Sequence, residues 1–122
     1  MKYVRLYTDS AGESHFEDIE VELTPVDYAP TAPPLNLSPF IPATQFAFMN
    51  APAGWKGDWH PASTRSVYFV LSGEWEVSAS DDTVRRFTSG SILQVEDTWG
   101  KGHASRVIRN GDSLAALIRR AD

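Results

Sequence analysis

The chain has 122 residues, a formal net charge of −5, 42% hydrophobic residues and no cysteine. This length suits one domain, and the hydrophobic fraction is typical of a folded protein. The lack of cysteine excludes disulfides and thiolate metal sites, and the acidic balance argues against nucleic acid as a partner. No apolar run is long enough for a membrane span or a secretory signal, so we expect a cytoplasmic protein with no membrane partner.

Residues 2–8 and 16–23 are predicted to form two early strands. A proline-rich arm follows over residues 24–43, where fixed φ angles and missing N–H donors argue against a helix or a central strand. We therefore predict an extended, irregular arm. Its apolar residues predict packing on the chain's own barrel or on a partner subunit; they are Leu35, Leu37, Phe40 and Ile41.

The remaining core, about residues 44–120, contains short runs rich in β-branched and aromatic residues, separated by turn residues. The runs at 44–50, 66–71, 74–80, 84–87 and 92–95 are predicted strands. Asn110-Gly111 predicts a hairpin between residues 103–109 and 113–119, although helical spacing in 113–121 leaves a short helix as an alternative. We predict one all-β domain over residues 1–122, with a closed barrel or sandwich as its core.

Three histidines are candidates for chemistry. His15 lies in an early loop and is predicted to be on the surface. His60 and His103 each lie where a glycine-rich loop meets a β-run, which predicts that both face a barrel mouth. The structural alternative for His60 is a ring that only satisfies a backbone carbonyl at a strand start.

The stretch from Gly54 to Gly73 places a histidine six positions after its first glycine. It resembles the first motif of the cupin superfamily, which has Gly, five residues, His, one residue, His, three or four residues, Glu, six residues and Gly. Gly54, His60 and Gly73 match this spacing, but Ala62 replaces the second His and Ser66 replaces the Glu.

A second match begins at Gly90. The second cupin motif has Gly, five residues, Pro, one residue, Gly, two residues and His. Glu96 replaces the Pro, Thr98 replaces the second Gly, and His103 comes two residues later than the pattern expects. The resemblance spans Gly54 to His103 and implies a single-domain cupin-type jelly-roll β-barrel.

Cupins hold a divalent metal through three His and one Glu, and they include dioxygenases, isomerases, cyclases, lyases and non-enzymatic binders. Here the resemblance retains His60 and His103. Two imidazoles alone hold a first-row metal such as Fe, Mn, Ni or Zn weakly, whereas a carboxylate from Glu96 or Asp97 would complete a facial triad. The structural alternative for this carboxylate pair is a solvated, capped turn.

Strand alternation places His60, Ala62, Ser66, Tyr68 and Val70 on one face, which the resemblance directs toward the interior. Ser66 and Tyr68 are therefore predicted to contact a ligand.

Three tryptophans lie in the two segments expected to frame the mouth. Trp55, Trp59 and Trp99 are predicted to contact a planar or apolar small molecule, with burial under the arm or at a dimer interface as the alternative.

Three functions remain open. The first is an isomerase, cyclase or lyase that uses His60 and His103 as acid and base, with Glu96 orienting one of them. The second is a metal-dependent enzyme of dioxygenase or Lewis-acid type, with Glu96 or Asp97 as the third ligand. The third is a non-catalytic binder or sensor of a small organic molecule. The resemblance also implies a homodimer, because cupins commonly pair through outer strands and exchanged N-terminal segments.

Overall fold

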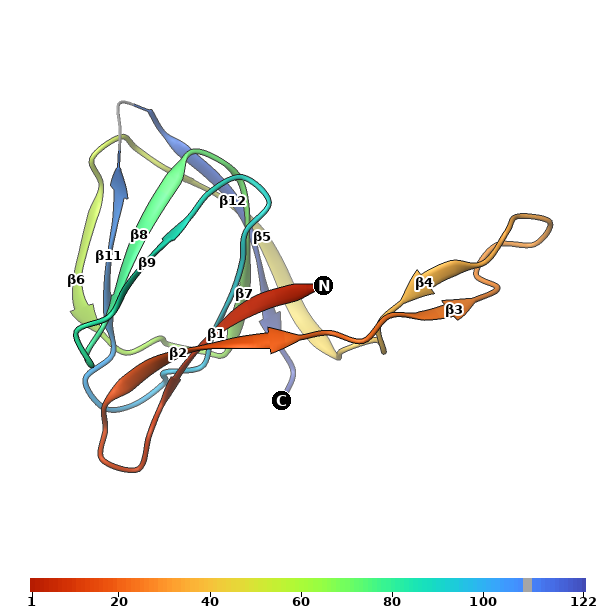
Figure 1. Ribbon diagram of the computed structural model, residues 1–122. Helices are drawn as coiled ribbons and strands as arrows, with labels where there is room; N and C mark the ends of the chain where they lie inside the picture. The colour runs from red at the N-terminus through yellow and green to blue at the C-terminus, as the bar shows by residue number, and fades with distance from the viewer. Residues whose placement is uncertain (109–110) are drawn as a thin grey trace.

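The computed structural model describes residues 1–108 and 111–122, and this part of the chain forms twelve strands and no helix (Figure 1). The all-β prediction is confirmed. Accordingly, none of the described residues belongs to a helix that could cross a membrane.

Two sheets build the barrel. The larger sheet has the order β2-β1-β10-β7-β12-β5, and β1 and β10 are its parallel pair. Its strands are β2 Ser14–Glu20, β1 Lys2–Thr8, β10 Ile92–Val95, β7 Ser66–Ser72, β12 Ser113–Arg120 and β5 Ala43–Ala51. The smaller sheet has the order β6-β11-β8-β9. Its strands are β6 Lys56–His60, β11 His103–Ile108, β8 Glu74–Ala79 and β9 Val84–Phe87.

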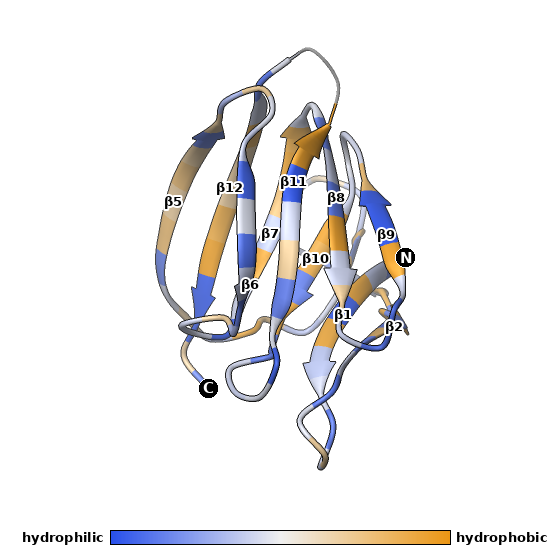
Figure 2. Cartoon of the chain, turned by 90° about the vertical axis from the view of Figure 1, so that its left-hand side faces the viewer, coloured by the Kyte–Doolittle hydropathy of each residue, from blue (hydrophilic) through white to orange (hydrophobic). Residues whose placement is uncertain are grey.

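Apolar and polar residues alternate along strands such as β8, whereas β5 and β12 are apolar over most of their length (Figure 2), and each sheet turns an apolar face inward. The apolar faces enclose a core that includes Leu6, Val70 and Phe87. A buried hydrogen bond also links the two sheets, since Trp75 Nε1 on β8 donates to Ser113 Oγ on β12 at 2.6 Å. The core thus lies between the sheets and leaves one end of the barrel for a site.

Most strands lie where the sequence pattern predicts them, with two corrections. Residues 51–58 are predicted to form a turn, but the chain enters strand β6, Lys56–His60, before the end of that segment. The predicted hairpin between residues 103–109 and 113–119 is wrong, because β11 pairs with β6 and β8 whereas β12 pairs with β5 and β7. Asn110 of the proposed turn lies outside the described residues. The strand interpretation of residues 113–119 is confirmed.

The proline-rich arm is a two-stranded ribbon rather than an irregular segment. Strand β3, Thr24–Val26, pairs with β4, Leu35–Leu37. The ribbon projects away from the barrel (Figure 1), and Leu35 and Phe40 are 51% and 83% exposed. The arm therefore does not pack on its own barrel, and packing on a partner stays a prediction.

Candidate active site

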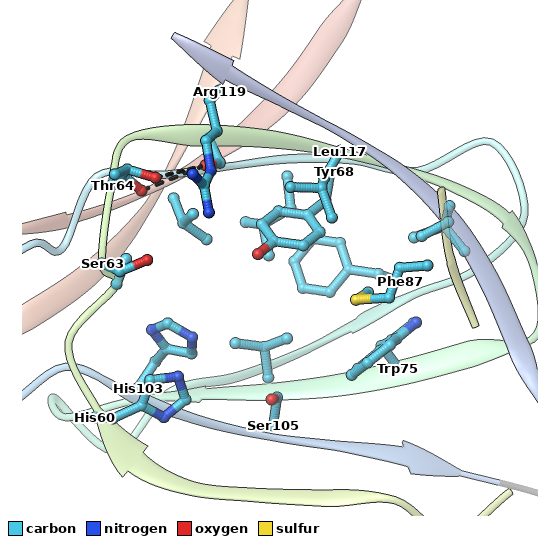
Figure 3. A pocket seen from close by; sticks show the side chains of 18 of the residues that line it. His60, Ser63, Thr64, Tyr68, Trp75, Phe87, His103, Ser105, Leu117 and Arg119 are labelled. Carbon is cyan, nitrogen blue, oxygen red and sulfur yellow. Dashed lines mark hydrogen bonds between the residues drawn. The ribbon is translucent and has the colours of Figure 1, made fainter. Parts of the chain in front are cut away.

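A cavity of about 260 Å³ lies between the two sheets and is lined by residues from both of them. It is not filled by side chains, so the barrel can accept a small molecule. Figure 3 shows its polar groups gathered toward one end, around His60, His103, Ser63 and Arg119, and its aromatic groups toward the other. The residues His60, Ala62, Ser66, Tyr68 and Val70, which strand alternation placed on one face, all line it.

The two histidines are brought together by strand pairing. His103 begins β11 and lies opposite His60, the last residue of β6. Their ring centroids are 4.9 Å apart with planes tilted by 50°. His60 is exposed, whereas His103 is 9% exposed. One imidazole thus meets solvent at the mouth while the other is shielded beside it.

Gly102 makes this close approach possible. Its φ is +72°, and a Cβ built there would lie 2.1 Å from the His60 carbonyl oxygen. Only glycine accepts both the left-handed conformation and the contact without a shift of the backbone. The Gly-Lys-Gly-His sequence at residues 100–103 therefore serves to bring β6 and β11 together at the histidine pair.

Asp97 lies behind His103. Its side chain is 0% exposed, and its Oδ2 is 2.6 Å from His103 Nδ1. Its Oδ1, however, has no hydrogen-bonding partner among the described residues. A buried oxygen without a protein partner costs about 1–3 kcal/mol, so its position beside His103 needs a structural or chemical explanation.

The neighbours of the two rings determine which nitrogens are free. A carboxylate and a backbone carbonyl only accept hydrogen bonds, so His103 Nδ1 donates to Asp97. By the same reasoning His60 Nδ1 donates to the Asp58 carbonyl, at 2.6 Å. In each neutral ring the basic nitrogen is then Nε2. The carbonyl contact expected for His60 as a structural residue is present and is compatible with a chemical role.

Tyr68 and Arg119 extend the polar lining on the larger sheet. Tyr68, on β7, lies between Arg119 and the aromatic end of the cavity (Figure 3). Burial raises the pKa of Tyr68, which the charge of Arg119 opposes and that of Asp97 reinforces. The phenol is therefore a neutral hydrogen-bond donor at neutral pH. The Arg119 guanidinium is exposed and donates to Gln45 Oε1 at 3.1 Å.

The opposite end of the cavity is apolar. Val70, Trp75, Phe87 and Leu93 form its walls, and Trp55 packs edge-on against Trp75 with ring centroids 5.6 Å apart. A ligand with an apolar body and a polar head would match this division.

The role predicted for Glu96 requires correction. Glu96 does not line the cavity; its side chain is 7% exposed and pairs with Arg5 and Arg65, while Gln94 Nε2 donates to it at 2.7 Å. Burial acts to raise the pKa of Glu96, but the hydrogen bonds and charges of Arg65 and Arg5 outweigh it and hold the pKa below its ordinary value. Asp97, not Glu96, is the carboxylate that orients a histidine.

The tryptophan prediction is also revised. Trp55 lines the cavity, but Trp59 and Trp99 do not. Trp59 is on strand β6, where alternation directs it away from the neighbouring His60, and it is 50% exposed. Trp99 is 53% exposed and lies against Gly12 in the early loop.

The third histidine lies apart from the cavity, and it is half-buried on strand β2 instead of in a surface loop as predicted. His15 is bonded to Asp9 and Asp81 through its two nitrogens, at 2.6 and 2.8 Å.

Solved structures with the same architecture establish the fold. The cupin domain of Schizosaccharomyces pombe Cnp3 is 12% identical, with a TM-score of 0.55, and the match covers 99% of this chain and 88% of that one. A cupin superfamily protein from Desulfitobacterium hafniense is 16% identical, with a TM-score of 0.52 and coverages of 84% and 79%. A Bordetella pertussis cupin domain is 12% identical, with a TM-score of 0.51 and coverages of 85% and 98%.

The chain has the cupin fold. No protein-family model matches the chain, and no curated protein matches it. At these identities the likeness concerns the fold alone.

The residues at the cupin metal position differ from the ligand set of the family. Ala62 and Ser66, which replace two ligands, line the cavity but carry no imidazole or carboxylate. Asp97 contacts Nδ1 of His103 from behind the ring instead of standing beside it as a third ligand. Among the described residues no group of three or more His, Cys, Asp or Glu could hold a metal ion. The residues therefore do not fit a resident metal of the cupin type.

Several cavity residues of this cupin barrel were missed from the sequence, among them Arg119, Thr64, Ser105 and Phe87. Ser105 and Phe87 follow the inward alternation of β11 and β9, so the strand pattern could have indicated them. The sequence around Arg119 does not predict a cavity position, because an Arg119-Arg120 pair is typical of a solvated strand end.

Proposed function

We propose that this cupin is an enzyme that moves a proton on a small, largely apolar organic molecule bound in its barrel, in an isomerisation, cyclisation or elimination next to a carbonyl. The observation that supports this most is the buried Asp97–His103 pair beside His60 at the cavity mouth. A carboxylate that accepts from Nδ1 fixes the tautomer and leaves Nε2 as the base.

The residues divide the work as follows. One neutral imidazole accepts the proton at Nε2, and the second imidazole, when it is protonated, donates a proton from its Nε2 to another position of the same molecule. The Tyr68 phenol, a neutral donor, would stabilise negative charge that develops on the carbonyl oxygen. The apolar end of the cavity holds the body of the molecule and excludes water from it.

Deuterium exchange tests this function. The purified protein, treated with a chelator, is incubated in D₂O with small carbonyl compounds that carry an apolar group, including phenylacetone and phenylpyruvate. Loss of the proton signal next to the carbonyl is followed by NMR and compared with buffer. We expect faster exchange with the protein, and at least a tenfold lower rate for His60→Gln and for His103→Gln.

His15→Gln is the matched control, because His15 lies apart from the cavity and should leave the rate unchanged. Exchange that is equal in all three variants would contradict the proposal. Binding without exchange would favour the non-catalytic binder, and exchange that returns only with a divalent metal would favour the metal-dependent enzyme.

We also propose that the protein is a homodimer. The projecting ribbon and the outer strand β5 both expose apolar residues: Phe40 is 83% exposed, and Phe46 and Phe48 are 71% and 73% exposed. Apolar patches of this kind on a monomer are uncommon outside interaction sites. Light scattering should give twice the chain mass, and Phe46→Ser with Phe48→Ser should shift it toward the monomer.

A further inference from the structure

Arg119 differs from every other arginine in the described part of the chain. Each of the others has a carboxylate oxygen within 4.0 Å. Arg119 has no such partner among the described residues, and its hydrogen bond goes to the neutral amide of Gln45. In a protein with a net charge of −5, a guanidinium without a carboxylate is an unusual feature.

The position of Arg119 indicates which chemical group its guanidinium can bind. Its side chain lines the cavity together with the hydroxyl residues Ser63 and Thr64 (Figure 3). A guanidinium has five N–H donors in a fork that matches a carboxylate, and Gln45 occupies only part of it. The remaining donors are available to an anionic group at the mouth.

The side chains on the cavity walls indicate what the rest of the ligand is like. His60 and His103 lie on β6 and β11, and Arg119 lies on β12 on the other side of the cavity (Figure 3). The apolar end of the cavity lies next to both of these walls. A ligand held at its charged head by Arg119 and at its apolar body by Trp75 and Phe87 would lie along Tyr68, with the two histidines facing it across the cavity (Figure 3).

We propose that Arg119 binds the carboxylate of the substrate, and that the substrate is a small apolar carboxylic acid with a ketone next to the reacting carbon. This inference rests on the proposed proton transfer. A proton leaves that carbon for an imidazole Nε2, the C–H electron pair forms the enolate, and the negative charge lies on the ketone oxygen near Tyr68. Delivery of a proton to the ketone oxygen then gives the enol isomer without any oxidant or reductant, whereas return of the proton to the same carbon regenerates the substrate and is seen as exchange.

Two probes isolate the carboxylate. Phenylpyruvate and phenylacetone share the aromatic ring and the ketone, and they differ in that a methyl group replaces the carboxylate. Their affinities for the wild-type protein are measured by calorimetry. We expect phenylpyruvate to bind at least tenfold more tightly, although the net charge of the protein repels anions.

Arg119→Gln should remove this preference by weakening phenylpyruvate at least tenfold while leaving phenylacetone unchanged. Arg119→Lys should keep part of it, because lysine retains the charge but not the fork. Arg106→Gln is the matched control: it removes the same charge from a residue that pairs with Glu76 and does not line the cavity.

The outcomes separate this inference from the proposed function. Equal affinities for the two probes in the wild type, no binding of phenylpyruvate, or an unchanged preference in Arg119→Gln would each overturn the role of Arg119. A preference that depends on Arg119 without any deuterium exchange would instead leave the carboxylate site standing and refute the proton transfer. His60→Gln should abolish exchange while the preference for phenylpyruvate remains.

Discussion

Glu96 and Asp97 are adjacent in the sequence, yet they belong to two different regions of the molecule. Glu96 lies on the outer side of the larger sheet, where Arg5 and Arg65 satisfy its carboxylate. Asp97 faces inward to His103 and keeps an oxygen without a partner. Each side chain is almost fully shielded from solvent, but only one is fully paired.

The difference separates stability from function. A carboxylate with strong partners stabilises the folded chain, whereas a buried carboxylate that is only half satisfied costs stability and persists where it serves chemistry. We therefore expect the outer cluster to govern the free energy of unfolding and the inner pair to govern the rate of proton transfer.

Gly102→Ala should have the largest effect, because it separates the two strands that carry the histidines. The added Cβ would lie 2.1 Å from the His60 carbonyl at a φ of +72°. We expect a loss of about 3 kcal/mol or more in the free energy of unfolding, measured by urea denaturation. Gly90→Ala, also at a positive φ of +91° but with open space around it, is the control and should cost less. Equal losses in the two variants would show that the contact with His60 is not decisive.

Asp97→Asn should slow deuterium exchange about a hundredfold, since the amide no longer fixes the His103 tautomer. Its free energy of unfolding should stay within about 1 kcal/mol of the wild type, because the unpaired oxygen of Asp97 already costs stability. A large loss of stability with an unchanged exchange rate would mean that Asp97 is structural.

Glu96→Gln should lower the stability of the protein and leave the exchange rate almost unchanged, the opposite of Asp97→Asn. The loss of charge opposite Arg5 and Arg65 should lower the free energy of unfolding by about 1–3 kcal/mol, measured by urea denaturation. The exchange rate should change less than threefold, because Glu96 does not line the cavity. A tenfold loss of rate at unchanged stability would place Glu96 in the catalytic machinery after all.

The pH dependence of the unfolding free energy gives a second test of the stabilising role of Glu96. The pKa of Glu96 is lowered in the folded chain from an ordinary value of 4.5. Its stabilising contribution is therefore fully present above that value and is lost as the pH falls through the lower folded pKa. The difference in unfolding free energy between the wild type and Glu96→Gln should shrink in acid. A difference that stayed constant from neutral pH into acid would contradict the ion-pair assignment.

The smallest expected effect is spectroscopic and requires no substitution. In ¹⁵N NMR spectra the neutral forms of His60 and His103 should both carry the proton on Nδ1. His15 is the internal comparison: its hydrogen bonds to Asp9 and Asp81 outweigh burial and raise its pKa. His15 should keep its second proton to a pH above the ordinary 6.5 of histidine. An Nε2–H tautomer at His103 would contradict the proposed base.

The sequence by itself determined the features that depend on local periodicity. Alternation of side chains every second residue placed His60, Ala62, Ser66, Tyr68 and Val70 on one face, and all five line the cavity. The resemblance of the segments around His60 and His103 to the cupin motifs likewise implied the cupin barrel, which the solved structures support.

Only the tertiary structure decided which distant groups meet. The pairing of His103 with His60 depends on the register of β11 against β6, and the contact of the sheets brought Arg119 to the cavity. Glu96 and Asp97 continue the alternation of β10, in which Leu93 and Val95 line the cavity while Gln94 bonds to Glu96 on the outer side, but only the fold shows that Asp97 meets His103. Local patterns fix φ and ψ preferences and the face of a strand, whereas register, sheet packing and turn direction arise from contacts between residues far apart in the chain.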